Sequence, residues 1–427
     1  MKKVLIGSTA LLAAGMIAGP AFAGEPMTAS KLDLSLGGDM SFKLEYQSRQ
    51  PKLSDTLAAD KRRNHNFELD GEMHVMGEAG NDAGLTFGFE VELEIAGAGV
   101  DGNGNDTVDQ NWIWVDGRFG KVYLGAKSVG AYQAKGDTET YSGVGLLTAD
   151  TGTNKASSVG DDIDDKNGNP DENNKFTWVA PSMGGVALAI DYVPDLSAQN
   201  TTGSTTNNDA GAIDKLMIIS LSYDFTMGGA DGTIEVGYAT ANAEDPQVDT
   251  DIENANRWRV GGEVSVAGFD VGGFWLQWNQ DAEDTNPTED ATTSGVFVQY
   301  ETGPWTVGAS WRRTTNDEMT AGTPNVKAGE DKYTQINGGV TYELSGDKTI
   351  KVGYETSKWD DHLNVATDEN DAKSLDIKFE WDVASGLEFD VGYQNFRYKQ
   401  HDITGPQSGP TVGRSGHALL ATTKVSF

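Results

Sequence analysis

The stretch that decides the fold is Leu85-Thr-Phe-Gly-Phe-Glu-Val-Glu-Leu-Glu-Ile95. Every second side chain from Leu85 to Ile95 is apolar, and the positions between carry threonine, glycine and three glutamates. Successive side chains of a β-strand point to opposite faces, so one face of this segment is apolar and the other is polar. Strict alternation over about ten residues is typical of a barrel strand with one face in lipid and one in water.

The same stretch also fixes the register of the strand. A shift by one residue would turn Glu90, Glu92 and Glu94 into hydrocarbon. A charge near the middle of a bilayer costs about 2 kcal/mol or more, and somewhat less for an acid. The shifted register is therefore strongly disfavoured.

Alternating segments recur along the whole chain and predict eighteen strands. We expect them near 32–48, 65–79, 84–96, 108–116, 121–127, 175–181, 186–193, 214–225, 233–240, 257–266, 269–279, 292–301, 305–314, 332–344, 348–358, 374–383, 387–399 and 414–427.

The connections between these segments alternate strictly between long and short. The short ones contain glycine, as tight turns require, and lie at 80–83, 117–120, 182–185, 226–232, 267–268, 302–304, 345–347 and 384–386. An antiparallel barrel with short periplasmic turns and longer outer loops has this rhythm, whereas a soluble β-sandwich has no reason for it. We therefore predict an all-β fold, a single transmembrane antiparallel up-and-down β-barrel without a separate soluble domain.

The first residues have the form of a secretory signal. Two lysines precede an apolar run from Val4 to Ala18, and Ala21-Phe-Ala23 matches a small-residue cleavage site. We expect residues 1–23 to be removed and 24–427 to form the barrel in the outer membrane of a Gram-negative cell. The partners implied are outer-membrane lipid and lipopolysaccharide, and periplasmic chaperones and the barrel-assembly machinery during biogenesis.

Composition excludes several classes of protein. The chain has no cysteine, which rules out disulfides and Cys-based metal or redox sites. After the signal it has no apolar run of about 18 residues, so no transmembrane helix is expected. The mature part carries 30 lysines and arginines against 65 aspartates and glutamates, a net charge of −35. No basic patch suggests binding of nucleic acid.

Three stretches resemble the general diffusion porins of Gram-negative bacteria. Arg118-Phe-Gly-Lys-Val-Tyr-Leu-Gly125 matches the core of a hairpin that precedes that family's long third loop, and a long segment follows here at 128–174. Lys175-Phe-Thr-Trp-Val-Ala-Pro181 is similar to the family's next strand. The terminal Lys424-Val-Ser-Phe427 is similar to its assembly signal.

The resemblance implies a water-filled channel for passive diffusion of small hydrophilic solutes and ions, a homotrimer, and no enzymatic activity. It also implies that loop 128–174 folds into the lumen as a constriction, with Asp137 and Glu139 in it. Gln110 or Asn111, and Ala126-Lys127, stand where the family has arginines, so its basic cluster is not matched. The family usually has sixteen strands and sugar-specific porins of the maltoporin type have eighteen. Both numbers stay open, and so does a substrate-specific porin.

Strand parity assigns charged residues to the lumen. The first three strands place nine acids there against Lys43: Asp33, Asp39, Glu45, Glu68, Asp70, Glu72, Glu90, Glu92 and Glu94. Basic residues follow later, at Arg257, Arg259, Arg312, Lys351 and Lys378. One wall is thus predicted to be acidic and the other partly basic, with a net preference for cations.

The long loop also contains an acidic run that partly resembles a calcium loop. It offers Asp162, Asp164, Asp165 and Asp171, and calcium prefers six to eight oxygen ligands. The spacing does not fit an EF-hand, so a structural calcium ion and a merely soluble acidic loop remain alternatives. No other cofactor is expected.

Aromatic residues near strand ends suggest interfacial girdles: Tyr46, Trp112, Trp178, Tyr192, Tyr223, Tyr238, Trp258, Trp275, Trp305, Trp381 and Tyr393. The faces of Trp112 and Trp114 stay open because Ile113 and Val115 compete for lipid. The five histidines are scattered at His65, His74, His362, His401 and His417, outside any recognisable nucleophile motif. A barrel enzyme, which needs a histidine grouped with serine or aspartate, is the remote alternative.

Overall fold

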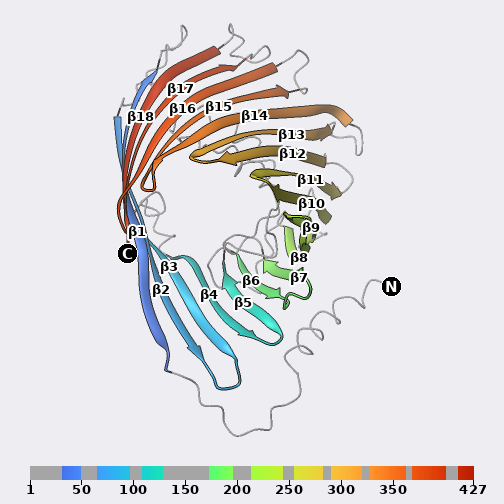
Figure 1. Cartoon of the computed structure of the whole chain (residues 1–427). Helices are drawn as coiled ribbons and strands as arrows, with labels where there is room; N and C mark the ends of the chain where they lie inside the picture. Colours follow the sequence, from blue (N-terminus) through green and yellow to red (C-terminus); the bar gives the residue numbers. More distant parts are fainter. Residues whose placement is uncertain are drawn as a thin grey trace.

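The structure is a computed structural model that describes residues 31–49, 65–96, 108–127, 173–195, 213–243, 254–281, 290–319, 327–361, 368–400 and 412–427. These ranges contain eighteen strands and no helix (Figure 1). The strands are β1 (Asp33–Arg49), β2 (His65–Gly80), β3 (Thr86–Ala96), β4 (Val108–Gly117), β5 (Gly120–Ala126), β6 (Asn174–Val179), β7 (Val186–Asp195), β8 (Ile213–Met227), β9 (Ala230–Ala243), β10 (Asn254–Val266), β11 (Phe269–Asp281), β12 (Asp290–Thr302), β13 (Trp305–Met319), β14 (Lys327–Ser345), β15 (Lys348–Asp361), β16 (Asp368–Ala384), β17 (Leu387–Gln400) and β18 (Val412–Ser426).

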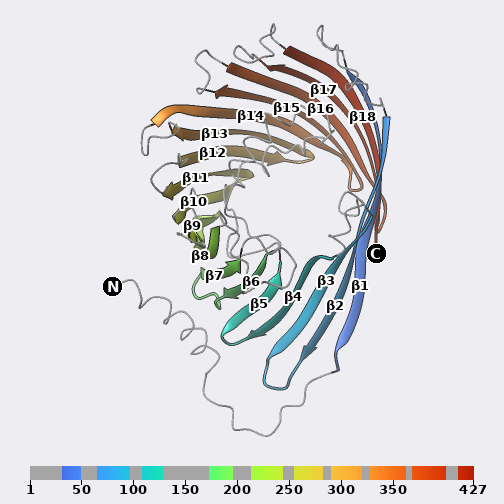
Figure 2. The ribbon, with the colours of Figure 1, turned by 180° about the vertical axis from the view of Figure 1, so that it is seen from behind.

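The strands form one closed antiparallel sheet. Each strand pairs with its neighbours in sequence, and β18 pairs with β1, as both views of the ribbon show (Figures 1 and 2). The prediction of an eighteen-stranded barrel is confirmed, and the alternative of sixteen strands is wrong. Among the described residues no helix is long and apolar enough to cross a membrane. The expected signal, 1–23, lies outside the described residues.

Strand ends at the short turns lie within three residues of the prediction, whereas at the long connections β13, β14 and β16 extend five or six residues further. β14 begins at Lys327 and not at 332, and β16 begins at Asp368 and not at 374. The added residues of β16 are Asp-Glu-Asn-Asp-Ala-Lys, which are polar on both faces. Hydrophobic alternation marks only the part of a strand that contacts lipid, so it cannot mark a hairpin that continues into water.

The exposed fraction of a side chain shows which face of the curved sheet it lies on, whatever its polarity. Side chains crowd together on the concave side of a closed sheet and spread apart on the convex side. Glu235 and Asp376 are only 1% and 0% exposed, whereas Leu34 and Val296 are 69% and 56% exposed. Charged residues therefore point inward and the large exposed apolar residues outward, which is the arrangement that lipid requires, while one apolar cluster around Leu216 is buried on the inner side.

The seam between β1 and β18 is completed by the last residue of the chain. Phe427 donates its backbone N–H to the carbonyl of Gly38 (3.0 Å), and Gly38 donates to the carbonyl of Phe427 (3.1 Å). A Cβ atom on Gly38 would lie 2.4 Å from the carbonyl oxygen of Glu72 and 3.2 Å from the ring of Phe427. Only glycine allows the three segments to approach this closely.

Short turns of the barrel use left-handed backbone. Gly228 and Gly229 between β8 and β9 have φ angles of 62° and 83°, and Ala267 and Gly268 between β10 and β11 have 53° and 83°. Two consecutive residues with positive φ match the type I′ turn, whose twist agrees with that of the flanking strands. These connections thus hold adjacent strands in one register.

We predict that Gly38→Ala impairs closure of the barrel. The added methyl group meets backbone of β2 at a distance that atoms do not reach without a shift, and overpacking of this kind costs about 1–3 kcal/mol. Gly37→Ala is the matched control, because its nearest neighbours lie at 3.5 Å, an ordinary contact. The yield of heat-resistant folded barrel after refolding into detergent measures closure. Equal yields for the two variants would contradict this account of the seam.

The outward assignment of apolar residues is tested on adjacent positions of β8. Leu221 is exposed on the convex face and lies opposite Leu188 and Val236, whereas Ser222 is buried on the concave face. We expect Leu221→Arg to lower the free energy of unfolding in lipid vesicles by about 2–4 kcal/mol, since it places a charge near the membrane midplane. Ser222→Arg should cost much less, because its guanidinium can extend into the lumen. If urea titrations show that Ser222→Arg loses more unfolding free energy than Leu221→Arg, the outward assignment of Leu221 is wrong.

Candidate functional site

The inner wall of β1, β2 and β3 gathers carboxylates from three strands. The register sets Asp39 opposite Glu72, and Glu72 opposite Glu94. Side chains that lie directly opposite on one face of an antiparallel pair are about 5 Å apart at Cβ. The acidic residues that alternate along each strand therefore form a continuous acidic surface on the concave face.

Two lysines pair with part of this acidic surface. The Lys43 Nζ lies 3.2 Å from Glu68 Oε2, and the Lys424 Nζ of β18 lies 3.1 Å from Asp39 Oδ2. Glu45 is buried and accepts a hydrogen bond from the side chain of Gln47. Pairs that are this exposed contribute little to stability. Lys127 also interacts electrostatically with Glu90 and Glu92, and three ammonium groups do not balance the nine predicted acids.

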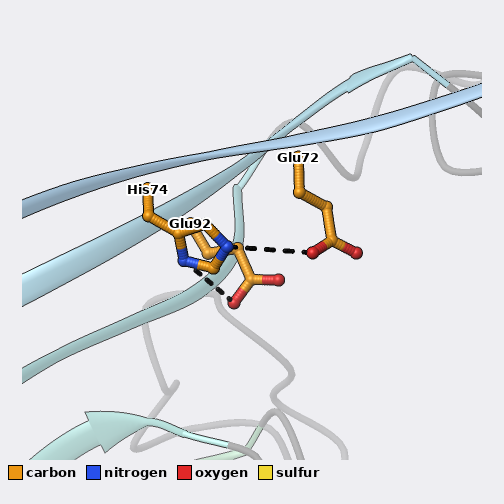
Figure 3. Close-up of side chains that lie close together, drawn as sticks. All are labelled: Glu72, His74 and Glu92. Carbon is orange, nitrogen blue, oxygen red and sulfur yellow. Dashed lines mark ion pairs between the residues drawn. The ribbon is translucent and has the colours of Figure 1, made fainter. Parts of the chain in front are cut away.

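His74 lies within the carboxylates of β2 and β3 (Figure 3). Its Nδ1 is 3.1 Å from Glu90 Oε1 and 3.9 Å from Glu92 Oε2, and its Nε2 is 3.8 Å from Glu72 Oε2. From the sequence alone, His74 was one of five scattered histidines without an assigned role. The two-residue spacing of Glu72 and His74 already places both side chains on one face of β2. The register between β2 and β3 was needed to identify Glu92 as a neighbour of His74.

Trp112 and Trp114 of β4 belong to the concave face. Trp112 is 8% exposed and the intervening Ile113 is 53% exposed, which settles the parity that the sequence left open. The Lys127 Nζ lies 4.3 Å from the ring centroid of Trp112, and the Lys121 Nζ lies 4.3 Å from that of Trp114. The prediction of Trp112 as a girdle residue is therefore wrong.

Other aromatic residues do lie on the outer face near strand ends, as predicted for girdles. Trp258 packs against Tyr238 with ring centroids 4.5 Å apart, and Trp305 packs against Tyr342 at 4.3 Å. Both tryptophans are exposed on the convex side. Such amphipathic rings suit the boundary between lipid and water.

The predicted arginines of the later strands share the concave face, and a carboxylate accompanies Arg259. Arg259 of β10 lies 3.3 Å from Glu235 of β9, and both side chains are almost fully buried. The guanidinium also lies 5.2 Å from the ring centroid of Phe274. Arg257 has the same parity as Arg259, and Arg312 of β13 is also buried.

The predicted lysines of β15 and β16 are paired as well. The Lys351 Nζ lies 2.9 Å from Glu380, and the Lys378 Nζ lies 2.8 Å from Glu380 and 3.1 Å from Asp390 of β17. These carboxylates offset the charge of both lysines, and the partly basic character of this wall stays a prediction. Sequence parity found the basic residues, but without the register it could not match them to their acidic partners.

The remaining predicted site residues cannot be placed. Asp137 and Glu139 of the expected constriction loop, and the calcium candidates Asp162, Asp164, Asp165 and Asp171, lie outside the described residues.

Comparisons with known proteins agree with this architecture. A family model described as Gram-negative porin matches residues 7–362. OmpTdeltaL8, a loop-deletion mutant of an outer membrane protein of Vibrio cholerae, aligns with a TM-score of 0.52 at 12% identity, covering 93% of this chain and 100% of that one. The outer membrane channel DcaP of Acinetobacter baumannii aligns with a TM-score of 0.50 at 11% identity, covering 93% and 97%. At these identities the structures show a shared fold alone. A comparison with curated protein sequences gives no match.

The buried pair of Arg259 and Glu235 is predicted to stabilise the barrel more than exposed pairs do. Glu235→Gln leaves a buried guanidinium without its carboxylate, and breaking such a pair costs about 3–5 kcal/mol. Glu68→Gln, which removes the partner of Lys43 on the exposed wall, should cost less than about 1 kcal/mol. Urea unfolding in lipid vesicles gives both values. Equal losses would show that burial does not strengthen the inner pair.

Proposed function

The chain belongs to the family of Gram-negative porins, and on that basis we propose that it forms a cation-preferring diffusion channel for small hydrophilic solutes. The channel itself follows from the family and the closed barrel. A barrel of 16 to 18 strands encloses more space than its inward side chains can fill, so its lumen holds water. Selectivity must then come from charges along the wall.

The observation that carries the cation preference is the acidic surface of β1, β2 and β3. Its acids occupy neighbouring positions across three strands, with Lys43, Lys424 and Lys127 as the cations beside them. Clustered charges of one sign beside low-dielectric walls raise the local concentration of counter-ions. We expect the opposite wall not to reverse this field, because three of its cations, Arg259, Lys351 and Lys378, each lie beside a carboxylate.

The contacts of the described histidines favour a passive channel over an enzyme. His74 contacts three glutamates, His417 contacts Tyr393 and Asn395, and the ring of His65 packs near Phe67. None of these is the grouping with serine that hydrolytic chemistry uses. His362 and His401 lie outside the described residues.

The remaining parts of the proposal rest on the resemblance to porins. We expect a homotrimer embedded in outer-membrane lipid and lipopolysaccharide, exported with removal of residues 1–23. We also expect loop 128–174 to narrow the lumen. A saturable block of the ionic current by one solute, such as a sugar, would instead favour a substrate-specific porin.

We predict that changing Glu90, Glu92 and Glu94 together to glutamine reduces cation preference without unfolding the barrel. Glutamine keeps the inner face polar and removes three charges from the acidic surface. The reversal potential of the variant, measured in planar bilayers across a salt gradient with a chelator present, should move toward the unselective value. Salt near 0.1 M is suitable, because charges there act over about 10 Å.

A control variant removes two carboxylates from the short turns and none from the wall. Asp82→Asn combined with Asp347→Asn should leave the reversal potential unchanged. A triple glutamine variant that conducts with unaltered selectivity would exclude these three residues from ion discrimination. An equal shift in the turn control would show that overall charge, and not the wall, sets the preference.

A further inference from the structure

We propose that His74, Glu72 and Glu92 form a binding site for a divalent transition-metal ion of the zinc class in the lumen wall. Each of the three residues offers one donor atom, and these atoms all lie within 4.8 Å of one another (Figure 3). The site is separate from the calcium run expected at 162–171. It is a mixed nitrogen and oxygen site and not a group of acids alone.

The pairing of two strands builds the site. Glu72 and His74 are two residues apart on β2, so they share the concave face, and His74 lies directly opposite Glu92 on β3. The register shifts at Gly71 and Glu72, where a bulge disturbs the ladder. Bulges re-aim side chains and are common beside functional sites. Three donors from two hydrogen-bonded strands are thus brought to one point of the wall.

A fourth residue, Glu90, sets the orientation of the imidazole. Its Oε1 lies 3.1 Å from His74 Nδ1, which is a hydrogen-bond distance. If Nδ1 carries the proton of the neutral ring, Nε2 keeps its lone pair and faces Glu72. Metal-ligating histidines usually donate their other ring N–H to a carboxylate in this way. Glu90 is therefore a positioning residue and not a ligand.

The distances suit a small ion after minor adjustment. Zinc binds histidine nitrogen and carboxylate oxygen at about 2.0–2.2 Å, so two donors of one tetrahedral ion are about 3.3 Å apart. His74 Nε2 and Glu72 Oε2 are now 3.8 Å apart, and Glu92 Oε2 lies 3.9 Å from Nδ1. Both glutamate side chains must therefore rotate toward Nε2 to complete the site. Lumen water can supply a fourth ligand.

The donor set selects the kind of ion. Calcium requires six to eight oxygens, and a site containing an imidazole does not suit it. Imidazole with carboxylate suits zinc, copper and nickel. The surrounding glutamates also favour a doubly positive ion over a single positive charge. Its binding would cancel part of the acidic surface and so weaken the cation preference of the channel.

Isothermal titration of zinc into purified metal-free protein in detergent tests the proposal without reference to conduction. We expect one zinc ion to bind per chain, and we expect this binding to require His74. His74→Ala and Glu92→Gln should weaken its binding at least tenfold, and Glu90→Gln should weaken it about 10- to 100-fold, the usual effect of losing an outer carboxylate. His417→Ala and Glu68→Gln are matched controls that should bind as the unmodified protein does. An excess of calcium should not displace the zinc.

A spectroscopic measurement keeps the test decisive if a variant fails to fold. Copper bound to the unmodified protein should show nitrogen superhyperfine splitting in its electron paramagnetic resonance spectrum, and the splitting should persist in His417→Ala. Absence of zinc binding, binding unchanged in folded His74→Ala, or a copper spectrum without nitrogen coupling would each overturn the site. Failure of the site leaves the proposed selectivity standing, because that is measured with a chelator present.

Discussion

The whole structure depends on the need of backbone N–H and C=O groups for partners inside hydrocarbon. Each unpaired group there costs several kcal/mol, so a sheet in lipid must close on itself. Pairing of β18 with β1, extended by Phe427 and Gly38, satisfies the last open edge. Closure then creates two surfaces that differ in curvature and in solvent. The alternation of side chains in every strand follows from these two surfaces.

Closure also determines where charge can go. A chain with 65 acidic residues cannot place them against lipid, so those on membrane-spanning strands must face the lumen. Their distribution there is uneven. On β1, β2 and β3 most acids are neighbours of one another and two of them pair with lysine, whereas the paired acids on β9 and from β16 to β17 lie beside arginine or lysine. The same requirement thus produces an acidic surface on one side and stabilising ion pairs on the other.

The sequence predicts features that depend on a single strand, such as its position and its two faces. It does not predict contacts between side chains of two strands. Period-two alternation, as in 85–95, locates the strands and assigns faces to Leu34 or Glu90. It fails at the outer ends of β14 and β16, where both faces are wet. Contacts between strands depend on register, which turns and bulges set. The environment of His74 and the pairing of Lys378 with Asp390 were therefore not predictable from spacing alone. Trp112 was ambiguous because its neighbours are also apolar.

The central claim is that the acidic surface of β1, β2 and β3 gives the lumen a preference for cations. The most direct measurement is the reversal potential of the unmodified protein in a planar bilayer across a potassium chloride gradient, first near 0.1 M and then near 1 M. A cation-preferring lumen gives a reversal potential of the corresponding sign near 0.1 M. This potential should be smaller near 1 M, because the screening length falls from about 10 Å to about 3 Å. A potential of the opposite sign near 0.1 M would contradict it.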